Sequence, residues 1–109
     1  MTGHTVVGVE VLRGLQAHLE HAGQVALSAD RHREALQYLQ WSRLLGTYSH
    51  ALQTTGYLGP SLLWVMSRDT ERAGDVAQRR DWVEVDALDI VASGLAVLAE
   101  LLERSAERV

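Results

Sequence analysis

The sequence contains no cysteine, lysine, asparagine or phenylalanine, and it has a single proline in 109 residues. Without cysteine, the chain can form no disulfide and can offer no thiolate to a substrate or a metal ion. Because all ten basic residues are arginine, the composition is typical of a GC-rich genome. The contents of 47% apolar and 22% charged residues are ordinary for a folded globular domain and argue against disorder.

Basic residues are too few to favour nucleic-acid binding. Ten arginines face fourteen acidic residues, which gives a formal net charge of −4. The excess lies in residues 61–109, where six arginines face ten acids, whereas residues 1–55 carry four of each. Arg79 and Arg80 are adjacent, but two arginines do not make a basic stripe that could follow a phosphate backbone. We therefore expect no nucleic-acid partner.

No stretch of the chain has the composition of a membrane span. The longest segment without a formal charge, residues 44–67, contains His, Gln, Thr, Ser, Pro and two central glycines. The first four residues lack a basic region, and no apolar segment of signal-peptide type follows them. We expect a protein that is cytoplasmic, or one that is exported without a cleaved signal peptide.

The fold is predicted from a turn near the middle of the chain. Gly56 suits the left-handed position just after a helix, and Pro60 suits the first position of the next helix. On both sides of this turn apolar residues recur every three or four positions, as in Val9, Leu12 and Leu15. We therefore expect an all-α single domain over residues 1–109. It is either an antiparallel helical hairpin or an up-down four-helix bundle, with its central turn at residues 56–60.

Whether each arm is one helix or two is left open by the pattern, although two are favoured. Residues 28–30 (Ser-Ala-Asp) offer side chains that can cap the start of a helix. Asp81 followed by Glu84 has the form of a capping box. The last helix is expected to run from Trp82 to about Arg108.

Candidate catalytic and metal-binding residues do not form a recognised motif. His18 and His21 are spaced like helical metal ligands, but they fall on a polar face, and no Glu-x-x-His pair accompanies them. Asp86 and Asp89 suit the positive end of a helix dipole better than acid–base catalysis. The chain has no Gly-x-Ser-x-Gly elbow. We expect no catalytic residues, no metal and no cofactor, and we favour a protein that is not an enzyme.

Six large rings must serve as the aromatic part of the core, because phenylalanine is absent. Any that remain exposed would mark a surface for a partner, since Trp and Tyr concentrate in binding hot spots. One group is predicted to line a pocket or an interface between helices: Trp41, Tyr48, His50 and Trp64.

The central turn also resembles that of a known family. The segment Gly56-Tyr57-Leu58-Gly59-Pro60-Ser61 is similar to the Trp-x-Gly turn of the WXG100 proteins, which are small helical hairpins associated with type VII secretion, with Tyr57 in place of Trp. Residues 82–86 (Trp-Val-Glu-Val-Asp) are similar to the Tyr-x-x-x-Asp/Glu signal of that family. The resemblance implies a non-enzymatic protein that pairs with a like chain into a four-helix bundle. It also implies that Trp82 and Asp86 form a composite export signal.

The leading hypothesis is a helical interaction module, either a homo-oligomer or paired with a second helical protein. It rests on apolar stripes that are wider than a 109-residue hairpin can cover by itself. The alternative is a small-molecule-binding bundle or minor enzyme with a pocket between its helices. A weaker alternative is an antitoxin or phage-type regulator, which would need a cognate partner.

Overall fold

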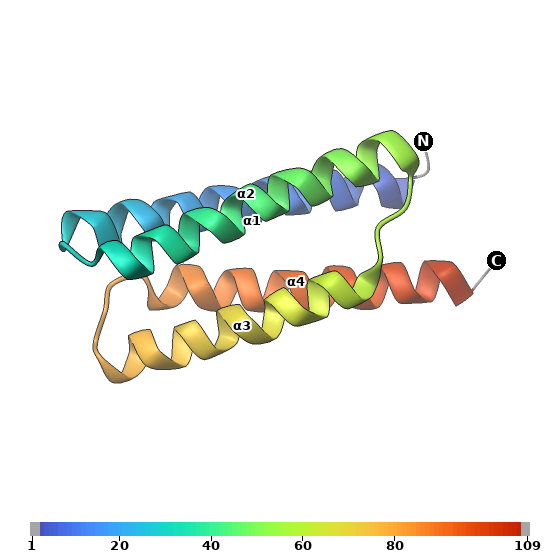
Figure 1. Ribbon diagram of the computed structural model, residues 1–109. Coiled ribbons are helices and arrows are strands. Elements are labelled where there is room, and N and C mark those ends of the chain that lie inside the picture. Colours follow the sequence, from blue (N-terminus) through green and yellow to red (C-terminus); the bar gives the residue numbers. More distant parts are fainter. Residues whose placement is uncertain (1–2, 108–109) are drawn as a thin grey trace.

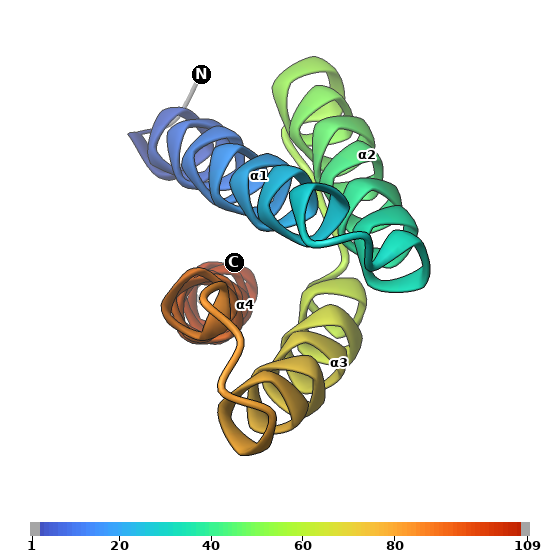
Figure 2. The same ribbon diagram turned by 90° about the vertical axis from the view of Figure 1, so that its left-hand side faces the viewer.

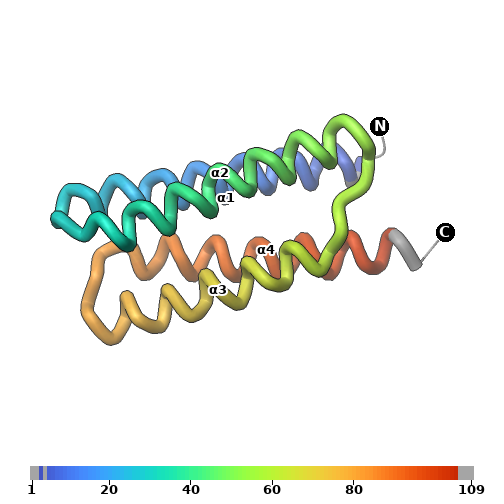
Figure 3. Tube along the Cα trace, in the orientation of Figure 1, coloured from blue at the N-terminus to red at the C-terminus, as the bar shows by residue number. Residues whose placement is uncertain are grey.

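The computed structural model describes residues 3–107, with side chains from Thr5 to Ser105, and shows an all-α four-helix bundle (Figure 1). The helices are α1 (Gly3–Ser28), α2 (His32–Thr55), α3 (Pro60–Arg79) and α4 (Val85–Glu107). Figure 3 shows the chain running up and down the long axis, with successive helices antiparallel. The predicted all-α bundle is confirmed, and each arm of the predicted hairpin consists of two helices. Arg108, the expected end of the last helix, lies outside the described residues.

The central turn forms for the reasons that the sequence suggests. Gly56 follows α2 with a φ of 72°, and its N–H donates to the carbonyl of Leu52 at 2.9 Å. Pro60 is the first residue of α3, where its missing N–H leaves no helical hydrogen bond unmade. Leu58 inside the turn is only 5% exposed, so the turn is anchored in the core, whereas Tyr57 points out and is 68% exposed.

The α1–α2 and α3–α4 turns lack the predicted N-terminal capping by aspartate side chains. Asp30 and Asp81 have φ values of 62° and 58°, so each sits in the left-handed position after a helix rather than capping the next one. No side-chain hydrogen bond caps α2. The last helix begins at Val85, not at Trp82. The predicted capping box is wrong because the Glu84 side chain bonds to Arg31 on the other hairpin, which offers it a charged partner.

The four helices do not all pack equally on their neighbours. Helix α1 packs along α2, α3 packs along α4, and α1 also lies against α4. In the end-on view of Figure 2, α1 stands between α2 and α4, while α2 and α3 lie apart. Within the described residues, α2 and α3 have no sustained backbone contact. The bundle is 47 Å long, and the backbones of α2 and α3 stand further apart than those of the other neighbouring helices; we call this flank the open α2–α3 side.

Leucine seams and close helix crossings form the core. Leu12 and Leu19 of α1 and Leu88 and Leu95 of α4 are fully buried. Glycines leave room for side chains of a neighbouring helix at several positions, of which two lie in the leucine core. A Cβ at Gly8 would lie 2.6 Å from Leu52, and one at Gly94 would lie 2.7 Å from Leu15. These two helix-interior glycines, each of which costs roughly 1 kcal/mol relative to Ala in an isolated helix, thus serve tertiary packing. No helix in the described part of the chain is long and apolar enough to cross a membrane.

We predict opposite effects of alanine at two other glycines. Gly56→Ala should lower the free energy of unfolding by about 1 kcal/mol, because alanine is strained at positive φ. Gly14→Ala should raise it by about 0.5–1 kcal/mol, because Gly14 lies within α1 with nothing within 4 Å of an added Cβ. Urea unfolding of the two variants measures both effects. A stabilised Gly56→Ala variant would contradict the left-handed turn.

Candidate functional site

The α1–α2 and α3–α4 turns lie at the same end of the bundle and are built in the same way (Figure 1). In the first, Arg31 N–H donates to Ala26 at 2.8 Å; in the second, Trp82 N–H donates to Ala77 at 2.8 Å. With the left-handed aspartates, these bonds form two Schellman motifs. The motifs bring the two turns together, so that the Arg31 guanidinium lies 4.0 Å from the centre of the Trp82 ring.

The centre of this end is a buried carboxylate. Glu84 is only 1% exposed. Its Oε2 accepts a hydrogen bond from Arg31 Nη1 at 2.5 Å, and its Oε1 accepts one from Arg31 Nη2 at 2.8 Å. The Tyr38 hydroxyl donates a third bond to Oε2 at 3.1 Å. We call this group the Arg31–Glu84–Tyr38 cluster. Its forked arginine–carboxylate geometry is the strongest form of charge-assisted hydrogen bond.

Burial and pairing act in opposite directions on the pKa of Glu84. Burial disfavours the charged form and by itself raises the pKa, but the hydrogen bonds from Arg31 and Tyr38 outweigh it. The pKa of Glu84 therefore lies below its ordinary value of 4.5. The hydrogen bond to Glu84 raises the pKa of Arg31, and burial, together with the charge of Glu84, raises the pKa of Tyr38. At neutral pH the pair is ionised and the phenol is a neutral donor.

The cluster has the properties of a structural contact between the hairpins rather than those of a catalytic group. Both Glu84 oxygens are engaged, and no buried side-chain nitrogen or oxygen in the described residues lacks a hydrogen-bond partner. A general acid or base needs to exchange a proton near neutral pH, whereas the carboxylate here is held in its charged form.

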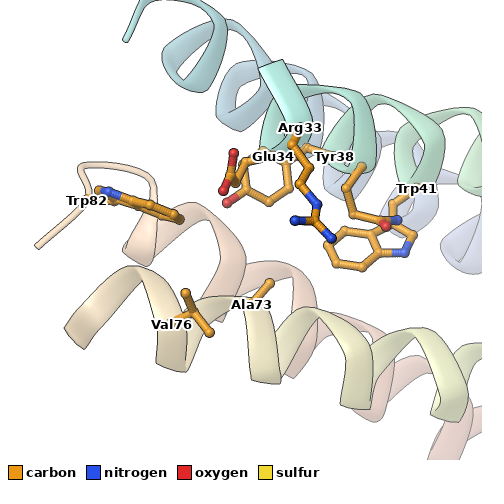
Figure 4. A pocket seen from close by; sticks show the side chains of 8 residues that line it. Arg33, Glu34, Tyr38, Trp41, Ala73, Val76 and Trp82 are labelled. Carbon is orange, nitrogen blue, oxygen red and sulfur yellow. The ribbon is translucent and has the colours of Figure 1, made fainter. Parts of the chain in front are cut away.

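A pocket of about 220 Å³ lies beside the cluster, between α2 and α3 (Figure 4). Three aromatic rings, two aliphatic side chains and three polar side chains line it. Those from α2 are Arg33, Glu34, Gln37, Tyr38 and Trp41; those from α3 are Ala73 and Val76; Trp82 comes from the α3–α4 turn. The pocket exists because α2 and α3 do not pack on each other at this level.

The structure separates the four residues that the sequence groups as a pocket or interface. Trp41 lines the pocket, and its ring centre lies 6.1 Å from that of Tyr38. Tyr48 is partly buried two turns further along α2, whereas His50 is exposed. Trp64 is partly buried and donates its indole N–H to Glu103 of α4 at 2.7 Å.

Tyr38 and Trp82 line the pocket but were not predicted to do so. Trp82 lies 41 positions after Trp41, and only the meeting of the two Schellman turns brings it there. The spacing between Tyr38 and Trp41, three residues on one helix, was a usable signal for that pair. No such signal in the sequence connects either residue with Trp82.

The residues of the predicted export signal lie in the α3–α4 turn and in the first turn of α4. Trp82 is partly buried under Arg31, and Asp86 is exposed in the first turn of the helix. The turn residues Gly56, Tyr57, Gly59 and Pro60 lie at the opposite end of the bundle from Trp82.

The candidate metal and acid–base residues remain at the surface. His18 and His21 are exposed on α1, and Asp86 and Asp89 are exposed on α4. Within the described residues, no three His, Cys, Asp or Glu side chains form a group that could hold a metal ion.

The chain matches no family model, no curated protein and no solved structure in the comparisons made. The fold and the site define the molecule as an all-α four-helix bundle with a buried ion pair between its two hairpins. Its function is therefore inferred from its geometry, and the WXG100 resemblance stays a prediction.

We predict that Glu84→Ala lowers the free energy of unfolding by about 3 kcal/mol, because it leaves the largely buried Arg31 guanidinium without its counter-charge. Glu100→Ala is the control, since Glu100 and its partner Arg104 are both more than half exposed and their ion pair contributes little. Chemical denaturation measures both variants. Equal effects would contradict a stabilising role for the cluster.

Stability should also depend on pH through Glu84. Because its folded-state pKa is lowered, its contribution is fully present above the unfolded pKa of about 4.5 and is lost as the pH falls through the folded value. Glu84→Gln should therefore lose less unfolding free energy than the wild type between about pH 5 and pH 2. Parallel profiles for the two proteins would contradict the lowered pKa.

Proposed function

We propose that this chain is a non-enzymatic helical interaction module whose open α2–α3 side is covered by a second helical chain. The observation that carries the proposal is the lack of sustained backbone contact between α2 and α3, whereas the other neighbouring helices lie close together. Large apolar side chains of these two helices remain exposed, among them Leu44 of α2 and Leu62 and Val65 of α3.

Helical spacing identifies the apolar residues of this side. On α3, Leu62 and Val65 stand eleven residues, or three turns, before the pocket residues Ala73 and Val76, so they share the same face. They are 45% and 59% exposed. Asp69, four residues after Val65 and four before Ala73, lies on the same face between the two pairs. A mostly apolar helix face of this kind is typical of a surface that receives a helix from a partner.

Helix α2 presents a matching row. Trp41 and Tyr48 are seven residues apart and partly buried, and Leu44 between them is 43% exposed. Tryptophan and tyrosine are the residues that most often carry binding energy at protein interfaces. The α2–α3 side therefore combines aromatic anchors on one helix with aliphatic side chains on the other.

The narrower role in type VII secretion is also proposed, and only the sequence resemblance supports it. The exposed Asp86 is accessible to a receptor, as an export signal requires. Trp82 also has a structural role, because its ring packs under the guanidinium of Arg31. A loss of export in a Trp82 variant would therefore need to be separated from a loss of folding.

We predict that the wild-type chain forms a dimer of twice its 12.0 kDa mass and that charge on the α2–α3 side disrupts it. Leu44→Glu combined with Val65→Glu should give a monomer, because the carboxylates would have to be buried in the interface. Multi-angle light scattering after size-exclusion chromatography measures the mass.

Val97→Glu is the matched control, since Val97 is 67% exposed and lies on α4, which is not one of the two helices of this side. It should leave the dimer intact. A monomeric wild type that also binds no neutral hydrophobic dye, such as Nile red, would contradict the proposed interaction surface. A monomer that binds the dye on its α2–α3 side would favour a different helical protein as the partner.

A further inference from the structure

We propose that the pocket between α2 and α3 binds a small aromatic carboxylate. The pocket is formed completely by one chain, but its Trp41 also belongs to the proposed interaction surface, so ligand binding is tested on a variant that does not associate as well as on the wild type. The size of the pocket, the chemistry of its walls and the free guanidinium of Arg33 point to this ligand (Figure 4).

The walls favour a flat apolar ligand. Tyr38, Trp41 and Trp82 supply aromatic surface, and the small side chains of Ala73 and Val76 form the α3 wall. Aromatic rings prefer offset or edge-to-face contact with another ring. The volume of about 220 Å³ is below the roughly 300–1,000 Å³ typical of pockets for drug-sized ligands, so a body of one or two fused rings suits it.

Arg33 supplies the group that would recognise an anion. Its side chain extends from α2 into the pocket in Figure 4. Within the described residues Arg33 makes no ion pair or hydrogen bond, so its five N–H donors are available. A guanidinium binds a carboxylate through two parallel hydrogen bonds, which also fixes the orientation of the ligand.

Arg33 is the lining residue that an anion would meet. The charged side chains of the lining are Arg33 and Glu34. Glu84, beside the pocket, is matched by its two hydrogen bonds to Arg31, and the charge of Glu34 also acts on Arg31. The guanidinium of Arg33 is therefore the charged donor that is available to a ligand.

The same geometry disfavours an organic cation. Aromatic cages bind cations through the faces of their rings. The Trp82 ring already has the guanidinium of Arg31 at 4.0 Å and that of Arg80 at 5.5 Å from its centre. Arg33 would add further repulsion for a positively charged ligand.

The test uses three naphthalene ligands of equal size and different charge: 2-naphthoate, neutral 2-naphthylmethanol and cationic 2-naphthylmethylammonium. Binding is followed by NMR titration of the full chain. We expect the order carboxylate, alcohol, ammonium, with the carboxylate about tenfold tighter than the alcohol because it gains charge-assisted hydrogen bonds.

Variants locate the site. Arg33→Gln should abolish the preference for the carboxylate and leave the affinity for the alcohol unchanged. Ala73→Leu should weaken both ligands by filling the pocket. Arg43 is an exposed arginine of α2 that does not line this pocket, so the Arg43→Gln variant should bind all three ligands as the wild type does. Repeating the titration on Leu44→Glu with Val65→Glu separates ligand binding from association of the chain.

Three results would overturn the proposal. They are no binding of 2-naphthoate at millimolar concentration, equal affinity for all three ligands, and a carboxylate preference that survives Arg33→Gln. Because Arg33 is exposed and makes no hydrogen bond or ion pair in the described residues, its replacement should leave the fold intact, which the dispersion of the NMR spectrum checks directly.

Discussion

The fold depends on one constraint, which is that a buried carboxylate needs a partner. Glu84 is removed from water at the start of α4, and an unpaired charge there would cost several kcal/mol. Its partner, Arg31, comes from the turn of the other hairpin, 53 positions away. The α1–α2 and α3–α4 hairpins are therefore joined at this end by a polar contact as well as by the apolar packing of α1 on α4.

The open side and the pocket lie next to this contact. The ion pair and the α1–α4 contact join the two hairpins, while α2 and α3 have no sustained backbone contact. The space beside Tyr38 becomes the pocket, and the rest of the open side presents apolar residues to a partner. A single geometric fact, the separation of α2 from α3, thus underlies both the proposed interaction surface and the proposed ligand site.

The fold was largely predictable from the sequence, but the site was not. Gly56, Pro60 and the apolar periodicity encode the central turn and the helices through local interactions. The helix breaks at residues 28–30 and at Asp81 were placed correctly. The two aspartates were given the wrong role in these turns, because aspartate is more common as an N-cap than in the left-handed position after a helix. Glu84 fits a capping box by spacing, and only the tertiary structure supplies Arg31 as its stronger partner. Trp82 likewise lines the pocket only because the tertiary structure brings the two turns together.

A double-mutant cycle on Arg31→Ala and Glu84→Ala tests the central claim most directly, because it isolates the free energy that the two side chains share across the hairpins. Unfolding free energies of the wild type, both single variants and the double variant give this coupling. We expect a coupling of about 2 kcal/mol, because removing the second partner relieves the unpaired charge left by the first. Effects that add to within about 0.5 kcal/mol would contradict it.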